Sequence, residues 1–249
     1  MKRWSLILAL LLLAVAPLGV TGCQQQPQTL VVGTSADYEP FEYIDENGNY
    51  TGFDIELMEE IGKRLNMEIE WQDIAFDGLI GSLQSDKIDA IIAAMSATPE
   101  REEQVDFTDP YFIGADAIIL AEGSDITITT NEDMTGYRVG VQTGTIQESW
   151  VEENIDAELS RYERAEQAIM DLQSGRIDAV AMDYYAAQSF IEQGGLELAL
   201  KTEFAGEHMA IAVKEGNTEL LEQLNEAIDE LQAEGFVEDL AMKYLSGGE

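Results

Sequence analysis

The sequence of 249 residues has one cysteine, one histidine and 13 basic residues against 49 acidic ones, for a formal net charge of -36. A single cysteine excludes an internal disulfide and a thiolate metal cluster. With a single histidine as well, the chain has few of the side chains that bind zinc, so we expect no metal site and no cofactor. Scarce lysine and arginine argue against nucleic-acid binding, because phosphate contacts need those side chains. Hydrophobic residues at 45% and charged residues at 25% are globular values and allow one or two domains with a real core.

The single histidine also limits hydrolytic catalysis. Serine and threonine are plentiful, but only His208 is available as the base that usually activates such a nucleophile. Carboxylate pairs occur throughout so acidic a chain and therefore do not indicate acid–base catalysis. We expect no catalytic residue and interpret His208, next to Glu207, as structural or as lying at the edge of a cleft.

The first 22 residues are typical of a secretion signal. Lys2 and Arg3 precede an apolar stretch that runs from Leu6 to Val20. At roughly 15 residues this stretch is shorter than the ~20 that a membrane-spanning helix needs. We therefore expect residues 1–22 to be a signal peptide that is removed from the mature protein.

Residues 20–23, Val-Thr-Gly-Cys, resemble a bacterial lipobox, in which the signal is cut before the cysteine and its thiol is lipidated. The resemblance implies a lipoprotein anchored through Cys23, with residues 23–28 as a polar tether and an extracytoplasmic location in the periplasm or on the outer face of the cell membrane. The alternative is an ordinary signal peptide followed by an incidental free cysteine.

The acidic residues are spread along the chain rather than gathered in a tail. Such a surface suits a high-salt habitat, because salt screens the repulsion between like charges. We therefore expect a salt-adapted host.

The N-terminal part of the mature chain alternates strand and helix patterns. Residues 30–33 and 68–71 are expected to be strands. Residues 43–53 alternate around Asp-Glu-Asn-Gly-Asn, which predicts a hairpin. Asp54 is expected to cap the helix that follows.

An internal repeat then indicates two similar halves. Residues 83–90, Leu-Gln-Ser-Asp-Lys-Ile-Asp-Ala, match residues 172–179, Leu-Gln-Ser-Gly-Arg-Ile-Asp-Ala, at most positions. In each copy an apolar-faced helix ends in a turn and a buried strand follows, which is typical of a parallel α/β sheet. Two such lobes favour a ligand held between them, just past the matched strands, near residues 94–101 and 183–185.

Arg101 and Asp183 are the candidate ligand-binding charges. A guanidinium past the first strand end can bind a carboxylate with two parallel hydrogen bonds, and Asp183 at the matching place in the other lobe suits an ammonium group. Together they fit a zwitterionic α-amino acid. The alternatives are a surface arginine paired with neighbouring glutamates and a helix-capping aspartate.

Three further positions are candidates for the cleft. Residues 142–147, Gln-Thr-Gly-Thr-Ile-Gln, follow a strand and open a helix, so their backbone N–H groups can hold an anion, although a plain strand–helix turn explains the pattern equally well. Tyr38 and Phe76 are candidate aromatic walls, with core packing as the alternative.

Several motifs, in their order and spacing, resemble one family. The chain is similar to the polar amino-acid-binding proteins of ATP-binding-cassette importers, the bacterial extracellular solute-binding proteins of family 3, over about residues 29–245. The motifs that carry the resemblance are Tyr-Glu-Pro-Phe at 38–41, Thr-Gly-Phe-Asp at 51–54, Ile-Asp-Ala at 88–90 and 177–179, Thr-Pro-Glu-Arg at 98–101 and Val-Asp-Phe-Thr-Asp-Pro-Tyr at 105–111.

The resemblance implies an α/β, two-lobed periplasmic-binding-protein-like fold of type II, with two parallel-sheet lobes joined by two hinge strands. Residues 29–111 and 209–249 would form the first lobe and residues 112–208 the second, with hinges at 111–115 and 207–210. It also implies a monomer that closes around a free amino acid and delivers it to the importer's permease subunits.

Carried over by position, the resemblance assigns Arg101 to the ligand carboxylate and Asp183 to its ammonium group. Eight positions would contact the ligand: Tyr38 and Phe76 as walls, Ala94 through its carbonyl, Ser96 through its hydroxyl, Arg101, Thr145 and Ile146 through N–H groups, and Asp183. Several binders of cationic ligands and of glutamine have aspartate where this chain has Ser35. The resemblance thus implies a polar amino acid, which is either basic, and then needs another acid such as Glu39 or Glu207, or not cationic. Ser35 and Gln142 are further candidate contacts of its side chain.

Two other functions remain open on sequence alone. The same fold houses cyclohexadienyl dehydratases, which eliminate water from prephenate or arogenate, and Glu39, Glu207 or His208 would be the acid candidates here. A sensory input module that acts through a separate partner protein is the second alternative.

Overall fold

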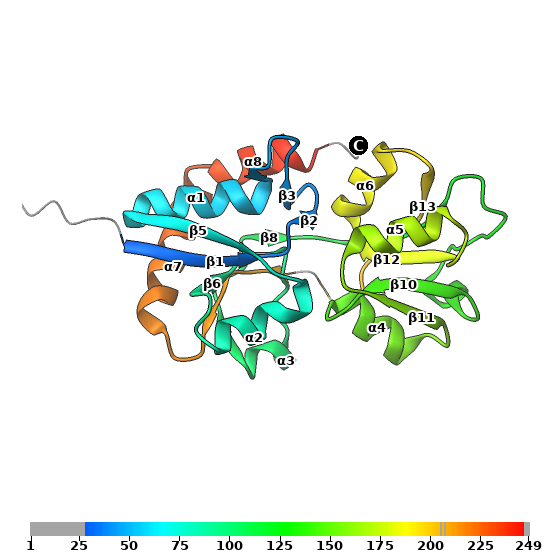
Figure 1. Ribbon diagram of the computed structural model, residues 1–249, viewed down its shortest axis with the longest axis horizontal. Coiled ribbons are helices and arrows are strands. Elements are labelled where there is room, and N and C mark those ends of the chain that lie inside the picture. Colours follow the sequence, from blue (N-terminus) through cyan, green and yellow to red (C-terminus); the bar gives the residue numbers. More distant parts are fainter. Residues whose placement is uncertain (1–27, 205, 207, 247–249) are drawn as a thin grey trace, which may run out of the picture.

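A computed structural model describes residues 28–204, 206 and 208–246. The expected signal peptide, Cys23 and most of the expected tether, as well as Glu207, lie outside the described residues. The described chain forms two α/β lobes side by side, joined near β8 (Figure 1). None of the helices in this described part is long and apolar enough to cross a membrane.

The first lobe has a five-stranded sheet in the order β5-β1-β6-β15-β7. Its strands are β1 (Gln28–Thr34), β5 (Met67–Asp73), β6 (Ala90–Ile91), β7 (Val105–Phe107) and β15 (Ala212–Lys214). Its helices are α1 (Phe53–Leu65), α2 (Leu79–Gln84), α3 (Pro99–Glu102), α7 (Thr218–Ala233) and α8 (Phe236–Tyr244), with a 3-10 turn at Phe76–Gly78. Helices α1, α7 and α8 bury their apolar faces on one side of the sheet, and α2 covers the other (Figure 1).

The second lobe repeats this plan with the order β11-β10-β12-β9-β13. Its strands are β9 (Asp116–Ala121), β10 (Arg138–Gln142), β11 (Glu158–Tyr162), β12 (Ala179–Asp183) and β13 (Leu196–Thr202). Its helices are α4 (Ile146–Asn154), α5 (Ala165–Gln173) and α6 (Tyr184–Glu192), with a 3-10 turn at Asn131–Met134. Apolar clusters fill both faces of this sheet as well.

The sheets are mixed, which corrects the prediction of parallel sheets. In each lobe three neighbouring strands pair parallel, β5-β1-β6 in the first and β11-β10-β12 in the second, but β15 pairs antiparallel with β6, and β9 pairs antiparallel with β12. Both of these strands follow directly after the chain has crossed from the other lobe. A strand that enters from the far side runs opposite to those built by strand–helix–strand units.

Two chain segments connect the lobes. Strands β8 (Phe112–Ile113) and β14 (His208–Met209) pair with each other antiparallel at the crossover. The predicted hinge segments, residues 111–115 and 207–210, contain these strands. The crossover therefore brings the two connections side by side at one edge of the interface between the lobes.

The sequence repeat has a clear structural basis. In the first copy Asp89 accepts a hydrogen bond from the Val31 N–H at 2.8 Å, and in the second Asp178 accepts one from the Arg138 N–H at 2.9 Å. Each aspartate thus fastens the turn after a helix to the neighbouring parallel strand. The same packing explains the weaker echo around Gly33 and Gly140, where an added Cβ would lie 2.4 and 2.5 Å from the isoleucine that precedes the repeated aspartate.

The hairpin prediction is confirmed by β3 (Glu42–Ile44) and β4 (Tyr50–Thr51), which form a three-stranded sheet with β2 (Asp37–Tyr38). The expected cap of α1 is wrong. Gly52, with φ of 126°, stands at the N-cap, and Asp54 lies inside the first turn, fully buried. Gly52 is required because an added Cβ would lie 2.2 Å from the carbonyl oxygen of Phe41.

Candidate functional site

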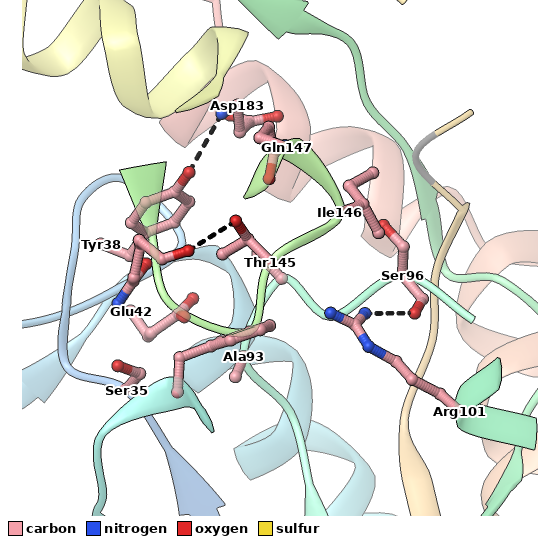
Figure 2. Close-up of a pocket in the computed structure, with 13 residues that line it drawn as sticks. Ser35, Tyr38, Glu42, Ala93, Ser96, Arg101, Thr145, Ile146, Gln147 and Asp183 are labelled. Atoms are coloured by element: carbon pink, nitrogen blue, oxygen red, sulfur yellow. Dashed lines mark hydrogen bonds between the residues drawn. The ribbon is translucent and has the colours of Figure 1, made fainter. Parts of the chain in front are cut away.

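A pocket lies between the two lobes, at the carboxyl ends of their central strands. It is lined from the first lobe by Ser35, Tyr38, Glu42, Phe76, Ala93, Ala94, Ser96 and Arg101, and from the second by Gln142, Thr145, Ile146, Gln147 and Asp183. Figure 2 shows most of these side chains around one space. All eight residues assigned to the ligand from the sequence are therefore brought together, with Ser35 and Gln142 beside them.

Arg101 is held rigidly at one side of the pocket. Helix α3 begins at Pro99, and the N-cap Thr98 hydroxyl accepts the Arg101 N–H at 3.3 Å. Arg101 Nη1 donates to the carbonyl oxygen of Ser96 at 2.6 Å, and its guanidinium carbon lies 5.3 Å from the centre of the Phe76 ring. The side chain is 8% exposed, which disagrees with a surface arginine and leaves a cation facing the ligand space.

Asp183 stands on the other wall at the end of β12. Its Oδ1 accepts the Ala186 N–H at 2.9 Å, so it caps α6 and lines the pocket at the same time. Its own N–H donates to the Tyr38 hydroxyl of the first lobe at 3.0 Å (Figure 2). The capping and ligand-binding interpretations of this aspartate are thus compatible.

The loop between β10 and α4 completes the second wall. The Thr145 hydroxyl accepts the Glu148 N–H at 3.2 Å as the N-cap of α4 and donates to the Gln142 carbonyl oxygen at 2.8 Å. Ile146 opens the helix, so the backbone N–H groups of its first turn face the pocket side. The predicted strand–helix turn is confirmed.

The lobes touch across the pocket. Arg101 Nη2 donates to the carbonyl oxygen of Gly144 at 2.9 Å. Gly144 has φ of 83°, and an added Cβ would lie 3.1 Å from Asp77 Cβ in the first lobe. A glycine here allows the loop of the second lobe to approach the first closely, so the structure is a closed form.

An ion-pair network spans the lobes beside the pocket. Arg164, just before α5, donates from Nη1 to Asp37 at 3.1 Å, to Asp73 at 2.9 Å and to the Ser35 hydroxyl at 3.3 Å. The Ala165 N–H donates to the other Asp37 oxygen at 2.9 Å. Burial raises the pKa of Asp37, and the bonds from Ser35 and Arg164 partly oppose that rise. Nothing in the sequence singled out Arg164.

Of the two acids predicted for a cationic ligand, only Glu39 can be placed, and it lies away from this pocket. Glu39 faces a separate depression with Tyr185, Gln188 and Glu192, and Glu207 lies outside the described residues. Besides Asp183, the acid that lines the pocket is Glu42, which is 1% exposed. Glu42 was not among the residues predicted from the sequence, although its place between two aromatic residues, Phe41 and Tyr43, is a signal of burial.

Asp54 lies behind the pocket wall and holds the pocket-lining residue Ala94 in place. Its Oδ2 accepts the Ala94 N–H at 2.6 Å and the Tyr111 hydroxyl at 2.9 Å. Ala94 has φ of 45°, a left-handed conformation that is costly for alanine and is stabilised here by the bond to Asp54. The described residues contain no group of three histidine, cysteine or carboxylate side chains that could hold a metal ion.

The fold and pocket define a class of protein: a two-lobed α/β solute-binding protein of the type II periplasmic kind. A family model for bacterial extracellular solute-binding proteins, family 3, matches residues 30–247. The chain belongs to this family, which confirms the resemblance found in the sequence.

Relatives with named ligands differ among themselves. The chain is 33% identical to the L-cystine-binding protein TcyJ of Escherichia coli over 87% of this chain and 82% of the relative. It is 34% identical to the arginine-binding extracellular protein ArtP of Bacillus subtilis over 99% of both. It is 33% identical to a putative ABC transporter arginine-binding protein 2 of E. coli over 87% of this chain and 90% of the relative.

Solved structures agree with the fold. An ancestral arginine-binding protein bound to arginine has a TM-score of 0.83 and 40% identity, covering 88% of this chain and 99% of its own. An ancestral arginine-binding protein bound to glutamine has a TM-score of 0.82 and 40% identity, covering 87% of this chain and 97% of its own. An ancestral amino acid-binding protein, AncCDT-1, described as a precursor of cyclohexadienyl dehydratase, has a TM-score of 0.81 and 33% identity, covering 87% and 95%.

Proposed function

We propose that this protein captures a cationic amino acid outside the cytoplasm and delivers it to the permease of an ABC importer. The observation that carries the proposal is the pair of opposite charges on facing walls of one pocket, Arg101 from the first lobe and Asp183 from the second. A guanidinium and a carboxylate so placed complement the carboxylate and ammonium groups of an α-amino acid. Binding both ends at once requires both lobes, so ligand favours the closed form.

The remaining lining residues have roles that follow from this orientation. Arg101, the Ser96 hydroxyl and the N–H groups of Thr145 and Ile146 bind the carboxylate. Asp183 and the Ala94 carbonyl bind the ammonium group. The rings of Tyr38 and Phe76 enclose the side chain, and Ser35 and Gln142 lie near its far end.

Glu42 supplies the negative charge for a cationic side chain. It is the pocket-lining acid left over once Asp183 is assigned to the ammonium group. It replaces Glu39, Glu207 and the absent aspartate at Ser35 as the acid that a cationic ligand needs. Two relatives named for arginine and a structural neighbour that binds arginine agree with this choice.

A binding role fits better than catalysis. Of the acids considered for a dehydratase, Glu39 faces a separate depression, and the side chain of His208 is exposed on β14. Neither lines the pocket in the described structure. The relatives and neighbours above are named for binding, including the dehydratase precursor.

Lobe closure is the working motion in this proposal. Residues 29–111 and 209–249 form one moving body and residues 112–208 the other, and the protein acts as a monomer. Its hinges are the segments at 111–115 and 207–210, supported by the pairing of β8 with β14 where the chain crosses.

Anchoring belongs to the same proposal, with Cys23 as the lipidated residue after removal of residues 1–22. Cells expressing the full chain and fed labelled palmitate should label the protein and retain it in the membrane fraction. A Cys23→Ser variant should be unlabelled and released. Equal labelling of both would remove the anchor from the proposal.

The deciding experiment is a thermal-shift screen of residues 24–249 in high salt against the twenty amino acids and ornithine. A ligand at 100 times its Kd adds about 2.7 kcal/mol to the free energy of unfolding, which is readily detected. We expect shifts with arginine, lysine or ornithine. Shifts confined to acidic or apolar amino acids, or none in folded protein, would contradict the proposal.

Arg101→Ala provides the matching test of orientation. Removing the guanidinium should weaken binding about 100-fold or more, since it loses a charge-assisted contact of about 3 kcal/mol. Arg176→Ala is the control, because Arg176 is exposed and pairs with Asp171 within the second lobe. Equal loss in both variants would show that general charge, not the pocket, sets affinity.

A further inference from the structure

Two buried carboxyl groups lie close together at one wall of the pocket, where the Asp54 N–H donates at 2.9 Å to the carbonyl oxygen of Phe41, the residue before Glu42. Glu42 on β3 is 1% exposed, and Asp54 on α1 is fully buried. Glu42 lines the pocket and Asp54 does not. In Figure 2 the Glu42 side chain lies on the side of the pocket that carries Ser35, Tyr38 and Ala93. The pair therefore has one member open to ligand and one member behind it.

The hydrogen bonds around the pair are unequal. Asp54 Oδ2 accepts two strong donors, the Ala94 N–H and the Tyr111 hydroxyl. Its Oδ1 is buried and has no hydrogen-bond donor among the described residues. Apart from Asp54, no described residue offers the Glu42 oxygens a hydrogen bond. Donors stabilise an ionised carboxylate, so Asp54 is the ionised member and Glu42 holds the proton.

The charged groups around Glu42 also favour its protonated form. Asp37 on β2 and Asp183 at the end of β12 both repel a negative charge on it. Among the neighbouring cations, Arg164 is engaged by Asp37 and Asp73, and Arg101 donates to the carbonyl oxygens of Ser96 and Gly144.

The aromatic hydroxyls nearby do not supply a charge either. Tyr38 and Tyr185 contact Phe41, the neighbour of Glu42, and burial raises the pKa of Tyr185 and Tyr111, so both phenols stay neutral. Burial, followed by the charge of Asp54, raises the pKa of Glu42 well above its usual value. For Asp54 burial raises the pKa to about 6, and its hydrogen bonds oppose a larger rise.

We propose that Glu42 and Asp54 share one proton in the ligand-free site and that a cationic ligand side chain displaces it on binding, so that Glu42 determines which side-chain charge is accepted. This inference rests on the proposed function. In the exchange the O–H bond of the Glu42 carboxyl group breaks, its electron pair stays on oxygen, and the proton leaves to water. The ligand cation replaces the proton as the positive charge beside Glu42, and the net charge of the buried pair and its partner is unchanged.

Because of this exchange, the same pocket can bind two classes of ligand, those with a neutral and those with a cationic side chain. With the proton in place, Glu42 is a neutral group that can donate to and accept from an amide or urea side chain. With the proton removed, it is the counter-ion of a guanidinium or ammonium group. Affinity for a cationic amino acid should therefore rise with pH, while affinity for a neutral analogue of the same shape should not.

Arginine and citrulline are the matched probes, because they have the same α-carboxylate and α-ammonium groups and differ mainly in side-chain charge. Calorimetric titration in two buffers of different ionisation enthalpy counts the protons released. Between pH 5.5 and 7.5 we expect arginine to release close to one proton and its Kd to fall by up to about tenfold per pH unit. Citrulline should release none, with a Kd constant within about threefold.

Glu42→Gln copies the protonated side chain and should remove both the proton release and the pH slope for arginine. Its arginine affinity should fall about 100-fold, while its citrulline affinity stays within about threefold of the wild type and reports that the site is folded. Glu46→Gln, an equal change at an exposed position of the same hairpin, is the control and should behave as the wild type.

The proton count on the wild-type protein needs no variant. Arginine binding without proton release between pH 5.5 and 7.5 would overturn the shared proton and leave the proposed function standing. Equal release by arginine and citrulline would also overturn it, because lobe closure rather than ligand charge would then displace the proton. Failure of arginine, lysine and ornithine alike to bind at any pH would overturn this inference and the cationic ligand together.

Discussion

Arg164 of the second lobe donates from Nη1 to Asp37 Oδ1 of the first lobe at 3.1 Å. The bond joins the two lobes next to the pocket, but neither Arg164 nor Asp37 lines the pocket itself. Asp37 also accepts the Ala165 N–H, so one carboxylate fastens both the guanidinium and the start of α5. This contact can form only when the lobes are closed.

Arg164→Gln should therefore destabilise the closed form. We expect the Kd for the ligand to rise about tenfold, or about 1.4 kcal/mol, because a half-buried charge-assisted contact is lost without a change in the ligand's own contacts. Small-angle scattering of the ligand-free protein should also show a larger radius of gyration. The measurements are calorimetric titration and scattering.

The control for this prediction is Arg161→Gln, on the neighbouring strand. Arg161 pairs with Glu148 and Glu152, which belong to the same lobe. Arg161 carries the same charge as Arg164, but its ion pairs do not join the two lobes. If both variants weaken binding equally, charge near the pocket rather than the interlobe contact is responsible.

Gly144→Ala tests how closely the lobes must approach. A Cβ at this position would lie 3.1 Å from Asp77 Cβ and 3.2 Å from its Cα, which are fixed atoms of the other lobe. Ligand affinity should fall by about tenfold or more, since closure must push these elements apart.

Gly136→Ala separates this effect from backbone strain. Gly136 has φ of 81°, close to the 83° of Gly144, but an added Cβ there meets nothing within 4 Å. Both variants should lose about 1 kcal/mol of folding stability. Only Gly144→Ala should lose affinity, and an equal loss in Gly136→Ala would contradict the steric explanation.

The buried acid pair should make the ligand-free protein less stable as pH rises. The pKa of Glu42 is raised well above its usual value by burial and by the Asp54 charge, so the folded state keeps a proton that the unfolded chain releases. The loss of folding stability that this causes is absent below the pKa of Glu42 in the unfolded chain. It is complete only above the pKa of Glu42 in the folded protein. From pH 5 to 8.5 the melting temperature of Glu42→Gln should rise relative to that of the wild type.

The reference for this pH series is Glu46→Gln, at an exposed position of the same hairpin. Its difference from the wild type should stay flat over the same range. A parallel difference in both variants would indicate that the general acidity of the chain, and not the pair, causes the pH dependence.

The acidic surface predicts a salt-dependent stability. Arg64 pairs with Glu60, Glu230 and Glu234, but 49 acidic residues against 13 basic ones leave a net charge of -36, whose mutual repulsion opposes folding. Salt should raise the melting temperature by at least about 5 °C between 0.05 and 1 M KCl and then level off, because screening is nearly complete at 1 M. A melting temperature unchanged over this range would count against salt adaptation.

Much of the architecture could be read from local patterns. The repeat at 83–90 and 172–179 predicted two similar lobes because each copy is a complete helix–turn–strand unit whose aspartate fastens the neighbouring strand. Arg101 could be found because Pro99 and Thr98 mark a helix start directly after a strand. The antiparallel strands β9 and β15 could not be predicted this way, since their direction depends on how the chain crosses between lobes.

The sequence by itself determined the two-lobed plan, the acidic surface and the pair of opposite charges on which the proposed amino-acid site rests. Only the tertiary structure decided which further acid faces the ligand. Glu39 and Glu42 lie three residues apart in the chain, yet Glu42 lines the pocket and Glu39 a separate depression. The reason is that strand pairing and the packing of α1 set the direction of each side chain, and neither is encoded in the local pattern of polar and apolar residues.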